Sequence, residues 1–103
     1  MPKILIVEDD VAFCQMLQKY LIKHDFDVFT SFTIEEAKKS FEDKGFDVIV
    51  SDVRLPKGDG VTLLSSIKEV SPTTKVILMT GYAEVKTAVD AMKRGAFEYI
   101  AKP

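Results

Sequence analysis

The chain has 103 residues, of which 47% are hydrophobic and 10% are aromatic. This length fits a single domain, residues 1–103, and this hydrophobic content excludes an intrinsically disordered chain. A net charge of −2 and a pI of about 5.4 give no reason to expect nucleic-acid binding by this segment. No apolar run approaches the ~20 residues of a membrane span, and no signal-peptide pattern opens the chain, so we expect a cytoplasmic protein without membrane contact.

Strands and helices are predicted to alternate through the first half of the chain. The aliphatic run Lys3–Val7 predicts a strand buried on both faces, and residues 10–23 show apolar positions at helical spacing. Residues 26–30 predict a weaker strand near an edge of the sheet. A capping-box pattern at residues 33–36 opens a second helix, which Gly45 ends.

The same alternation continues in the second half. Residues 47–51 predict a third strand, residues 61–67 a third helix, and residues 75–79 and 97–101 two further strands. Four apolar positions at helical spacing define a fourth predicted helix: Val85, Ala88, Val89 and Met92. Five strands separated by four helices predict an α/β fold with a doubly wound, mostly parallel five-stranded sheet.

Acidic residues follow two of the predicted strands. They are Glu8, Asp9, Asp10 and Asp52. Ligands of such sheets bind outside the carboxyl ends of the strands, so these carboxylates are expected to converge if the two strands are neighbours. Converging carboxylates repel one another unless a cation lies among them, and Mg²⁺ accepts such oxygen ligands. For Asp10, a purely structural role as the N-cap of the first helix remains an equal alternative.

A hydroxyl and an ammonium group follow two other predicted strands. Thr80 ends the fourth strand and Lys102 follows the fifth, so both would face the same crevice as the acids. Threonine can donate a hydrogen bond to a phosphoryl oxygen, and lysine supplies a positive charge. Either residue alone is common at a strand end without function. Their combination with the acids favours a phosphate site.

Four segments in fixed order carry a family resemblance: ILIVEDD, DVIVSDVRLPKGDG, VILMTGYAE and EYIAKP. Together they resemble the response-regulator receiver domain of two-component signalling over essentially the whole chain. The resemblance implies a flavodoxin-like topology and a phosphoryl group received by Asp52 from a sensor histidine kinase. It also implies a protein that catalyses its own phosphorylation and slow autodephosphorylation only, and is not otherwise an enzyme.

The resemblance implies a metal site and a switch. For Mg²⁺ it implies direct binding by Asp9, binding through water by Glu8, and ligation by Asp52 and by the backbone carbonyl of Arg54. The phosphate-contacting lysine and the two switch residues are then the following: Lys102, Thr80 and Tyr99.

Three further expectations come from the same resemblance. Arg54 and Tyr82 are expected to lie beside the route of the hydrolytic water and to slow dephosphorylation. The Lys102–Pro103 bond is expected to be cis. Residues 83–103 are most similar to receivers of enhancer-binding transcription activators, so an ATPase and DNA-binding output domain is expected outside this chain.

The chain departs from the family at its end. Family members continue into a fifth helix, whereas this sequence stops at Pro103, so we expect a truncated receiver. Loss of that helix is expected to uncover an apolar face that includes Ile4, Ile6 and part of the fifth strand. The expected results are reduced stability or self-association over this face, as in a homodimer.

Two alternatives to a phosphorylated receiver stay open. The first is a Mg²⁺-dependent phosphohydrolase that forms an aspartyl phosphate. Such enzymes commonly carry a second aspartate two residues after the nucleophile, and Arg54 at that place argues against this alternative. The second is a pseudo-receiver that binds partners without being phosphorylated. The intact acids, Thr80 and Lys102 disfavour it.

Overall fold

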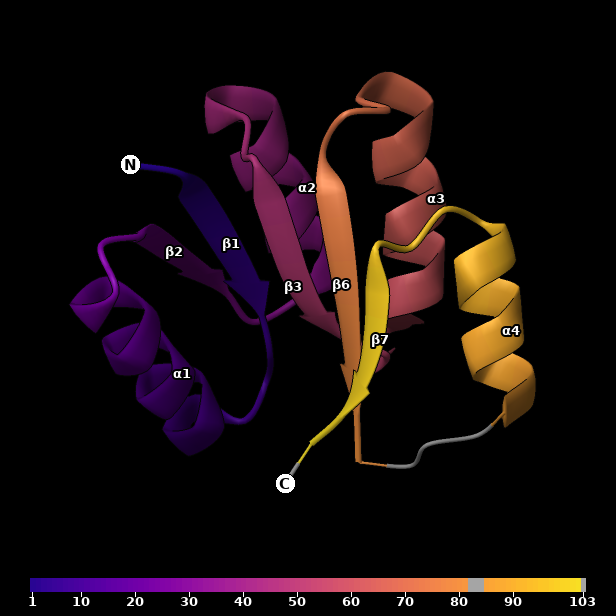
Figure 1. The fold of residues 1–103 in the computed structure, drawn as a ribbon, viewed down its shortest axis with the longest axis horizontal. Helices are drawn as coiled ribbons and strands as arrows, with labels where there is room; N and C mark the ends of the chain where they lie inside the picture. Colours follow the sequence, from indigo (N-terminus) through magenta and orange to yellow (C-terminus); the bar gives the residue numbers. More distant parts are fainter. Residues whose placement is uncertain (82–84, 103) are drawn as a thin grey trace.

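The computed structural model describes residues 1–81 and 85–102. Its main sheet contains five strands: β1 (Lys3–Val7), β2 (Asp27–Ser31), β3 (Val48–Asp52), β6 (Lys75–Thr80) and β7 (Glu98–Ala101). Their spatial order is β2-β1-β3-β6-β7, and every neighbouring pair is parallel. The predicted doubly wound sheet of flavodoxin-like topology is therefore confirmed, with β2 at an edge and β3 in the centre (Figure 1). The strand order reverses between β1 and β3, where such sheets bind ligands.

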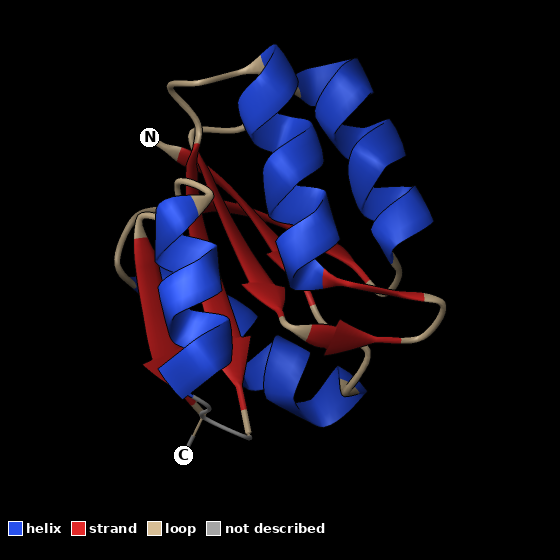
Figure 2. Cartoon of the chain, turned by 90° about the vertical axis from the view of Figure 1, so that its right-hand side faces the viewer, coloured by secondary structure: helices blue, strands red, loops and turns tan. Residues whose placement is uncertain are grey.

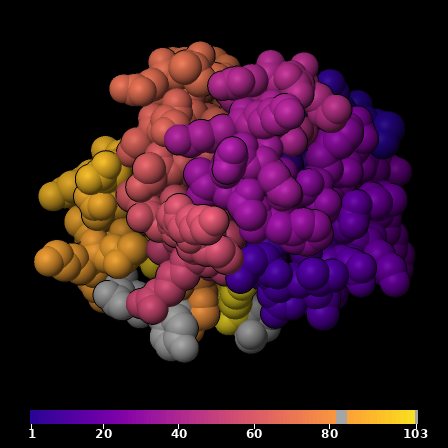
Figure 3. Space-filling model, turned by 180° about the vertical axis from the view of Figure 1, so that it is seen from behind, coloured from indigo at the N-terminus to yellow at the C-terminus, as the bar shows by residue number. Residues whose placement is uncertain are grey.

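Helices cover both faces of the sheet. They are α1 (Val11–Lys23), α2 (Ile34–Lys44), α3 (Gly60–Val70) and α4 (Val85–Lys93). Both α2 and α3 lie behind the sheet in Figure 1 and are at the surface in the view from behind (Figure 3), whereas α1 covers the opposite face at β1 and β2. Within residues 1–81 and 85–102, no helix is both long and apolar enough to cross a membrane.

Side-chain caps begin the first two helices where the sequence predicts them. The Oδ1 atom of Asp10 accepts the backbone N–H of Phe13 at 3.1 Å, so Asp10 is the N-cap of α1. At α2, Oγ1 of Thr33 accepts the N–H of Glu36 at 3.1 Å, while Oε1 of Glu36 accepts the N–H of Phe32 at 2.9 Å. These reciprocal bonds form the predicted capping box.

A short hairpin that the sequence analysis does not predict lies between β3 and α3. Its antiparallel strands are β4 (Arg54–Leu55) and β5 (Gly58–Asp59), and Figure 2 shows it leading into α3. Lys57 in its turn has a φ of 61°, in the left-handed region. Asp59 then caps α3, because its Oδ1 accepts the N–H of Thr62 at 2.8 Å. The hairpin therefore joins the carboxyl end of β3 to the start of α3.

Two apolar clusters fill the two faces of the sheet. Residues of the larger cluster, on the side of α2 and α3, include Leu5, Val7, Ile49, Leu63, Leu64, Val76 and Leu78. The smaller cluster, on the side of α1, contains Ile4, Ile6, Cys14, Val50 and Met79. Cys14 is buried, as its place on the apolar side of the helix predicts.

The expectation that Ile4 and Ile6 lie on an uncovered face is wrong. Their exposed fractions are 4% and 0%. Residues of α1 pack over both isoleucines, and these are Phe13, Leu17 and Leu21. On the same face of the sheet, Ile100 lies in register with Met79 and keeps 43% of its surface exposed. The exposed part of this face is therefore at β7.

The predicted fourth helix is present as α4, but the apolar positions that define it in the sequence do not all face the sheet. Val85, Val89 and Met92 are 82%, 47% and 48% exposed, whereas Ala91 is fully buried. The small side chain of Ala91 allows α4 to approach the larger cluster, which turns the bulkier apolar residues outward. Apolar residues at helical spacing mark both the side of α4 that contains Ala91 and the side that contains Val85. Spacing alone therefore does not decide which of these two sides faces the sheet.

The contact through Ala91 can be tested with matched substitutions on α4. Ala91→Leu adds volume to a filled site and should lower the free energy of unfolding by about 1–3 kcal/mol. Val85→Leu should change it by less than about 0.5 kcal/mol, since Val85 is exposed. Urea unfolding measures both values. A larger loss in the Val85 variant would contradict this orientation of α4.

Candidate functional site

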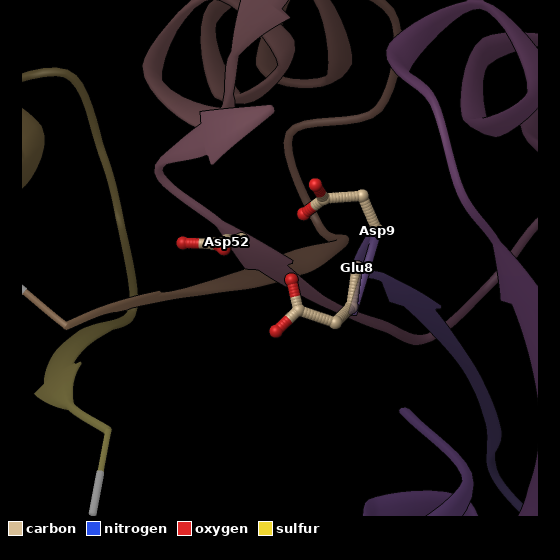
Figure 4. A group of neighbouring side chains, drawn as sticks. All are labelled: Glu8, Asp9 and Asp52. Carbon is tan, nitrogen blue, oxygen red and sulfur yellow. The ribbon is translucent and has the colours of Figure 1, made fainter. Parts of the chain in front are cut away.

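Three carboxylates meet at the carboxyl ends of β1 and β3. Glu8 follows β1 and is fully buried, Asp9 is exposed, and Asp52 is the last residue of β3 with 8% of its surface exposed. One carboxylate oxygen from each residue lies within 4.8 Å of the other two (Figure 4). The convergence expected for neighbouring strands is thus present, whereas Asp10 instead caps α1.

The ammonium group of Lys102 lies among these carboxylates. Its Nζ donates to Oδ2 of Asp52 at 3.0 Å and to Oε1 of Glu8, and the lysine side chain is 17% exposed. The backbone N–H of Lys102 donates to the carbonyl oxygen of Thr80 at 2.8 Å, which aligns the chain after β7 with the end of β6. One ammonium therefore connects residues that follow or end β1, β3 and β7.

The backbone around Asp52 holds its carboxylate in place. Its Oδ1 accepts the N–H of Arg54 at 3.4 Å, and its carbonyl oxygen accepts the hydroxyl of Ser51 at 2.9 Å. Gly60 packs directly against the same carbonyl, because a Cβ atom built on Gly60 would lie 2.4 Å from it. Any larger residue at position 60 must displace the end of β3.

Burial and charge shift two pKa values in the site. Burial raises the pKa of Glu8 to about 7; its hydrogen bond to Lys102 opposes this shift, and Asp52 adds to it. Burial alone lowers the pKa of Lys102, but hydrogen bonds to Glu8 and Asp52 outweigh burial and raise this pKa above its ordinary value. Both pKa values therefore depend on a single ammonium placed beside several carboxylates.

The acidic group has the donors that a divalent cation needs. Oε2 of Glu8 is buried without a hydrogen-bond partner among the described residues, and Asp9 and Asp52 each offer an oxygen nearby. Hard divalent cations bind carboxylate oxygens. Glu8, Asp9 and Asp52 are thus the residues that could hold such an ion.

The other residues singled out in the sequence lie around this group. Thr80 ends β6 and is 2% exposed, and Tyr99 of β7 is half-buried against the larger cluster, in register with Leu78. The Arg54 side chain is exposed. Tyr82 and the Lys102–Pro103 bond lie outside the described residues.

Sequence reasoning missed one neighbour of Lys102. The ring centroid of Phe13, in α1, lies 4.7 Å from Nζ of Lys102. In the sequence, Phe13 is one of several apolar residues at helical spacing. No local signal separates it from the others, because the contact joins residues at opposite ends of the chain.

Comparison with known proteins agrees with this geometry. A family model described as "Response regulator receiver domain" matches residues 4–103. The transcriptional regulatory protein ZraR of Salmonella typhimurium is 37% identical over 100 residues, which are 97% of this chain and 23% of that protein. The chain thus spans about a quarter of the length of this relative.

Comparison with solved structures also finds response regulators. The beryllofluoride-activated NtrC4 receiver domain dimer matches with a TM-score of 0.95 and 41% identity, covering 100% of this chain and 85% of that chain. A response regulator from Burkholderia pseudomallei, described with a phosphorylated aspartic acid, calcium ion and citrate, matches with a TM-score of 0.94 and 30% identity. That match covers 100% of this chain and 61% of the other.

The close approach of Gly60 to the Asp52 carbonyl predicts a sharp intolerance. Gly60→Ala should lower the free energy of unfolding by on the order of 2 kcal/mol, because its Cβ atom collides with backbone. Gly81→Ala is the matched control, since a Cβ atom there meets nothing within 4 Å. Denaturant unfolding of the two variants would contradict this contact if both were as stable as the parent chain.

The raised pKa of Glu8 predicts how metal-free stability depends on pH. The folded chain holds the Glu8 proton with a pKa of about 7, against an ordinary value of 4.5, so folding takes up a proton in this window. The contribution of Glu8 to stability therefore falls as pH rises from 4.5 to about 7, by on the order of 3 kcal/mol in total.

Unfolding curves of the parent chain and of Glu8→Gln, both in EDTA, measure this effect. The difference in free energy of unfolding between them should change across the window, since glutamine does not titrate. A difference that is constant from pH 4.5 to 7.5 would show that the pKa of Glu8 is not raised.

Proposed function

The chain belongs to the response-regulator receiver family of two-component systems, and we propose that Asp52 accepts a phosphoryl group from a histidine of a sensor kinase. The observation that carries this proposal is the Asp52 carboxylate at the end of the central strand, hydrogen-bonded to Lys102. The phosphorylated aspartic acid of the Burkholderia pseudomallei relative supports it.

The transfer requires little covalent chemistry from the protein. A carboxylate oxygen of Asp52 forms the new P–O bond as the P–N bond of the phosphohistidine breaks, and the imidazole leaves with the bonding electron pair. Such a step depends on positioning and on offsetting negative charge. Lys102 is placed for both tasks, because its ammonium already contacts an oxygen of Asp52.

Mg²⁺ is the proposed cofactor. Glu8, Asp9 and Asp52 hold it, with the backbone carbonyl of Arg54 as a further ligand. When bound, the ion supplies positive charge that offsets the charge on the transferring phosphoryl oxygens. Two observations support a divalent cation here: the buried Oε2 of Glu8, which has no hydrogen-bond partner within residues 1–81 and 85–102, and the calcium ion of the Burkholderia pseudomallei relative.

The proposed switch passes from the phosphoryl group to α4. Thr80 donates its hydroxyl hydrogen to a phosphoryl oxygen, and Tyr99 rotates into the space that Thr80 leaves. The exposed apolar residues of α4 lie at the end of this path, and they are Val85, Val89 and Met92. Self-association of the activated chain is supported by the activated receiver domain dimer of NtrC4.

The partners and the lifetime of the phosphoryl group complete the proposal. The partners are a sensor histidine kinase and an output domain with ATPase and DNA-binding activity. The likeness to the transcriptional regulatory protein ZraR supports a role in transcription. The domain, residues 1–103, catalyses its own phosphorylation and a slow autodephosphorylation. Arg54 and Tyr82 flank the route of the hydrolytic water and slow this loss.

A small phosphodonor tests the proposal. Incubation with acetyl phosphate and Mg²⁺, followed by intact mass measurement, should show one added phosphoryl group per chain. Asp52→Asn should add none. The surface control Asp43→Asn should behave as the parent chain, because Asp43 is exposed at the end of α2, which leads into the start of β3 and not to its carboxyl end.

Three results distinguish the alternatives. A phosphoryl group retained in Asp52→Asn would place the acceptor elsewhere. Steady release of phosphate without an accumulating adduct would indicate a phosphohydrolase. No adduct in any variant, with acetyl phosphate and Mg²⁺ in excess, would indicate a pseudo-receiver.

A further inference from the structure

The Lys102 ammonium has an aromatic neighbour in addition to its two carboxylate partners. The ring centroid of Phe13 lies 4.7 Å from Nζ, while the same nitrogen donates to Glu8 and Asp52. An ammonium within about 6 Å of a ring centroid is attracted by the negative face of the ring. The ring is therefore part of the binding site of this ammonium.

Contacts of the backbone and of the core restrict the position of this ring. The N–H of Phe13 donates to the Asp10 side chain that caps α1, and its ring packs against the smaller cluster. Lys102, by contrast, reaches the site from the end of the chain on a flexible four-carbon stem. A rigid ring beside a flexible stem restricts the positions that the ammonium can take.

This restriction bears on the acceptor because two carboxylates compete for one ammonium. Glu8 is fully buried and Asp52 nearly so, and each accepts from Nζ. Without the ring, the ammonium loses a contact that the carboxylates cannot replace. The Lys102 ammonium can offset charge on a phosphoryl group transferred to Asp52 only while it stays beside Asp52.

We propose that Phe13 is a positioning residue for phosphoryl transfer, whose aromatic face holds the Lys102 ammonium beside Asp52. The inference rests on the proposed function, since it assigns Phe13 a role in the reaction of Asp52. It differs from a packing role, because leucine would fill much of the same apolar space without an aromatic face.

Three variants separate the aromatic face from apolar bulk. Phe13→Leu should lower the rate constant of phosphorylation by acetyl phosphate on the order of 3- to 10-fold, whereas Phe13→Tyr should stay within about twofold of the parent chain. Phe97→Leu is the matched control. It removes a ring whose centroid lies 5.5 Å from Nζ of Lys75, and Phe97 precedes the start of β7, whereas the site lies at the carboxyl end of that strand. Its rate constant should not change.

A double-mutant cycle tests whether Phe13 acts through Lys102. In a Lys102→Met background, Phe13→Leu should cause no further loss of rate. A rate of Phe13→Leu equal to that of the parent chain would overturn the proposal. Equal losses in the presence and absence of Lys102, or equal losses in Phe13→Leu and Phe13→Tyr, would also overturn it, because they indicate packing alone.

A measurement without phosphate keeps this inference separate from the proposed function. The ring current of Phe13 should displace the NMR signals of the Lys102 ε-methylene protons, and Phe13→Leu should return them to ordinary values while Phe13→Tyr keeps the displacement. Unchanged signals in Phe13→Leu would overturn the contact itself. If the contact is present but no chain takes up a phosphoryl group, the proposed function fails and the positioning role fails with it.

Discussion

The ion pairs of Lys102 with Glu8 and Asp52 are the interaction on which this site depends. They connect residues at the ends of β1, β3 and β7, so distant parts of the chain must fold correctly before the charges meet. Buried charges are tolerated only when they are paired, and here a single ammonium serves two carboxylates. The apolar strands on either side hold this group at one edge of the sheet.

The same pairing leaves the site short of positive charge. Among the residues that the structure describes, one buried oxygen of Glu8 has no hydrogen-bond partner, and the pKa of Glu8 rises to about 7 because burial opposes its ionised form. Such a site gains stability from an added cation and disfavours added negative charge until that cation is present. In the proposed reaction, the electrostatics of three carboxylates would link metal binding to phosphoryl transfer.

Much of this arrangement is predictable from the sequence. Aliphatic runs mark the strands, their alternation with helices gives the parallel sheet, and the rule for carboxyl ends brings Glu8 and Asp52 together before any coordinates are known. What the sequence does not predict depends on tertiary packing. The family resemblance places Ile4 on an uncovered face, whereas α1 covers it. Helical spacing does not specify the exposure of Val85 or the contact of Phe13 with Lys102.

The identity of the modified residue tests the central claim most directly. Borohydride reduces an aspartyl phosphate to homoserine, and peptide mapping of the reduced protein locates that homoserine. The account predicts homoserine at position 52 after treatment with acetyl phosphate and Mg²⁺, and aspartate at position 9. Homoserine at position 9, or a reduced residue anywhere other than position 52, would contradict it.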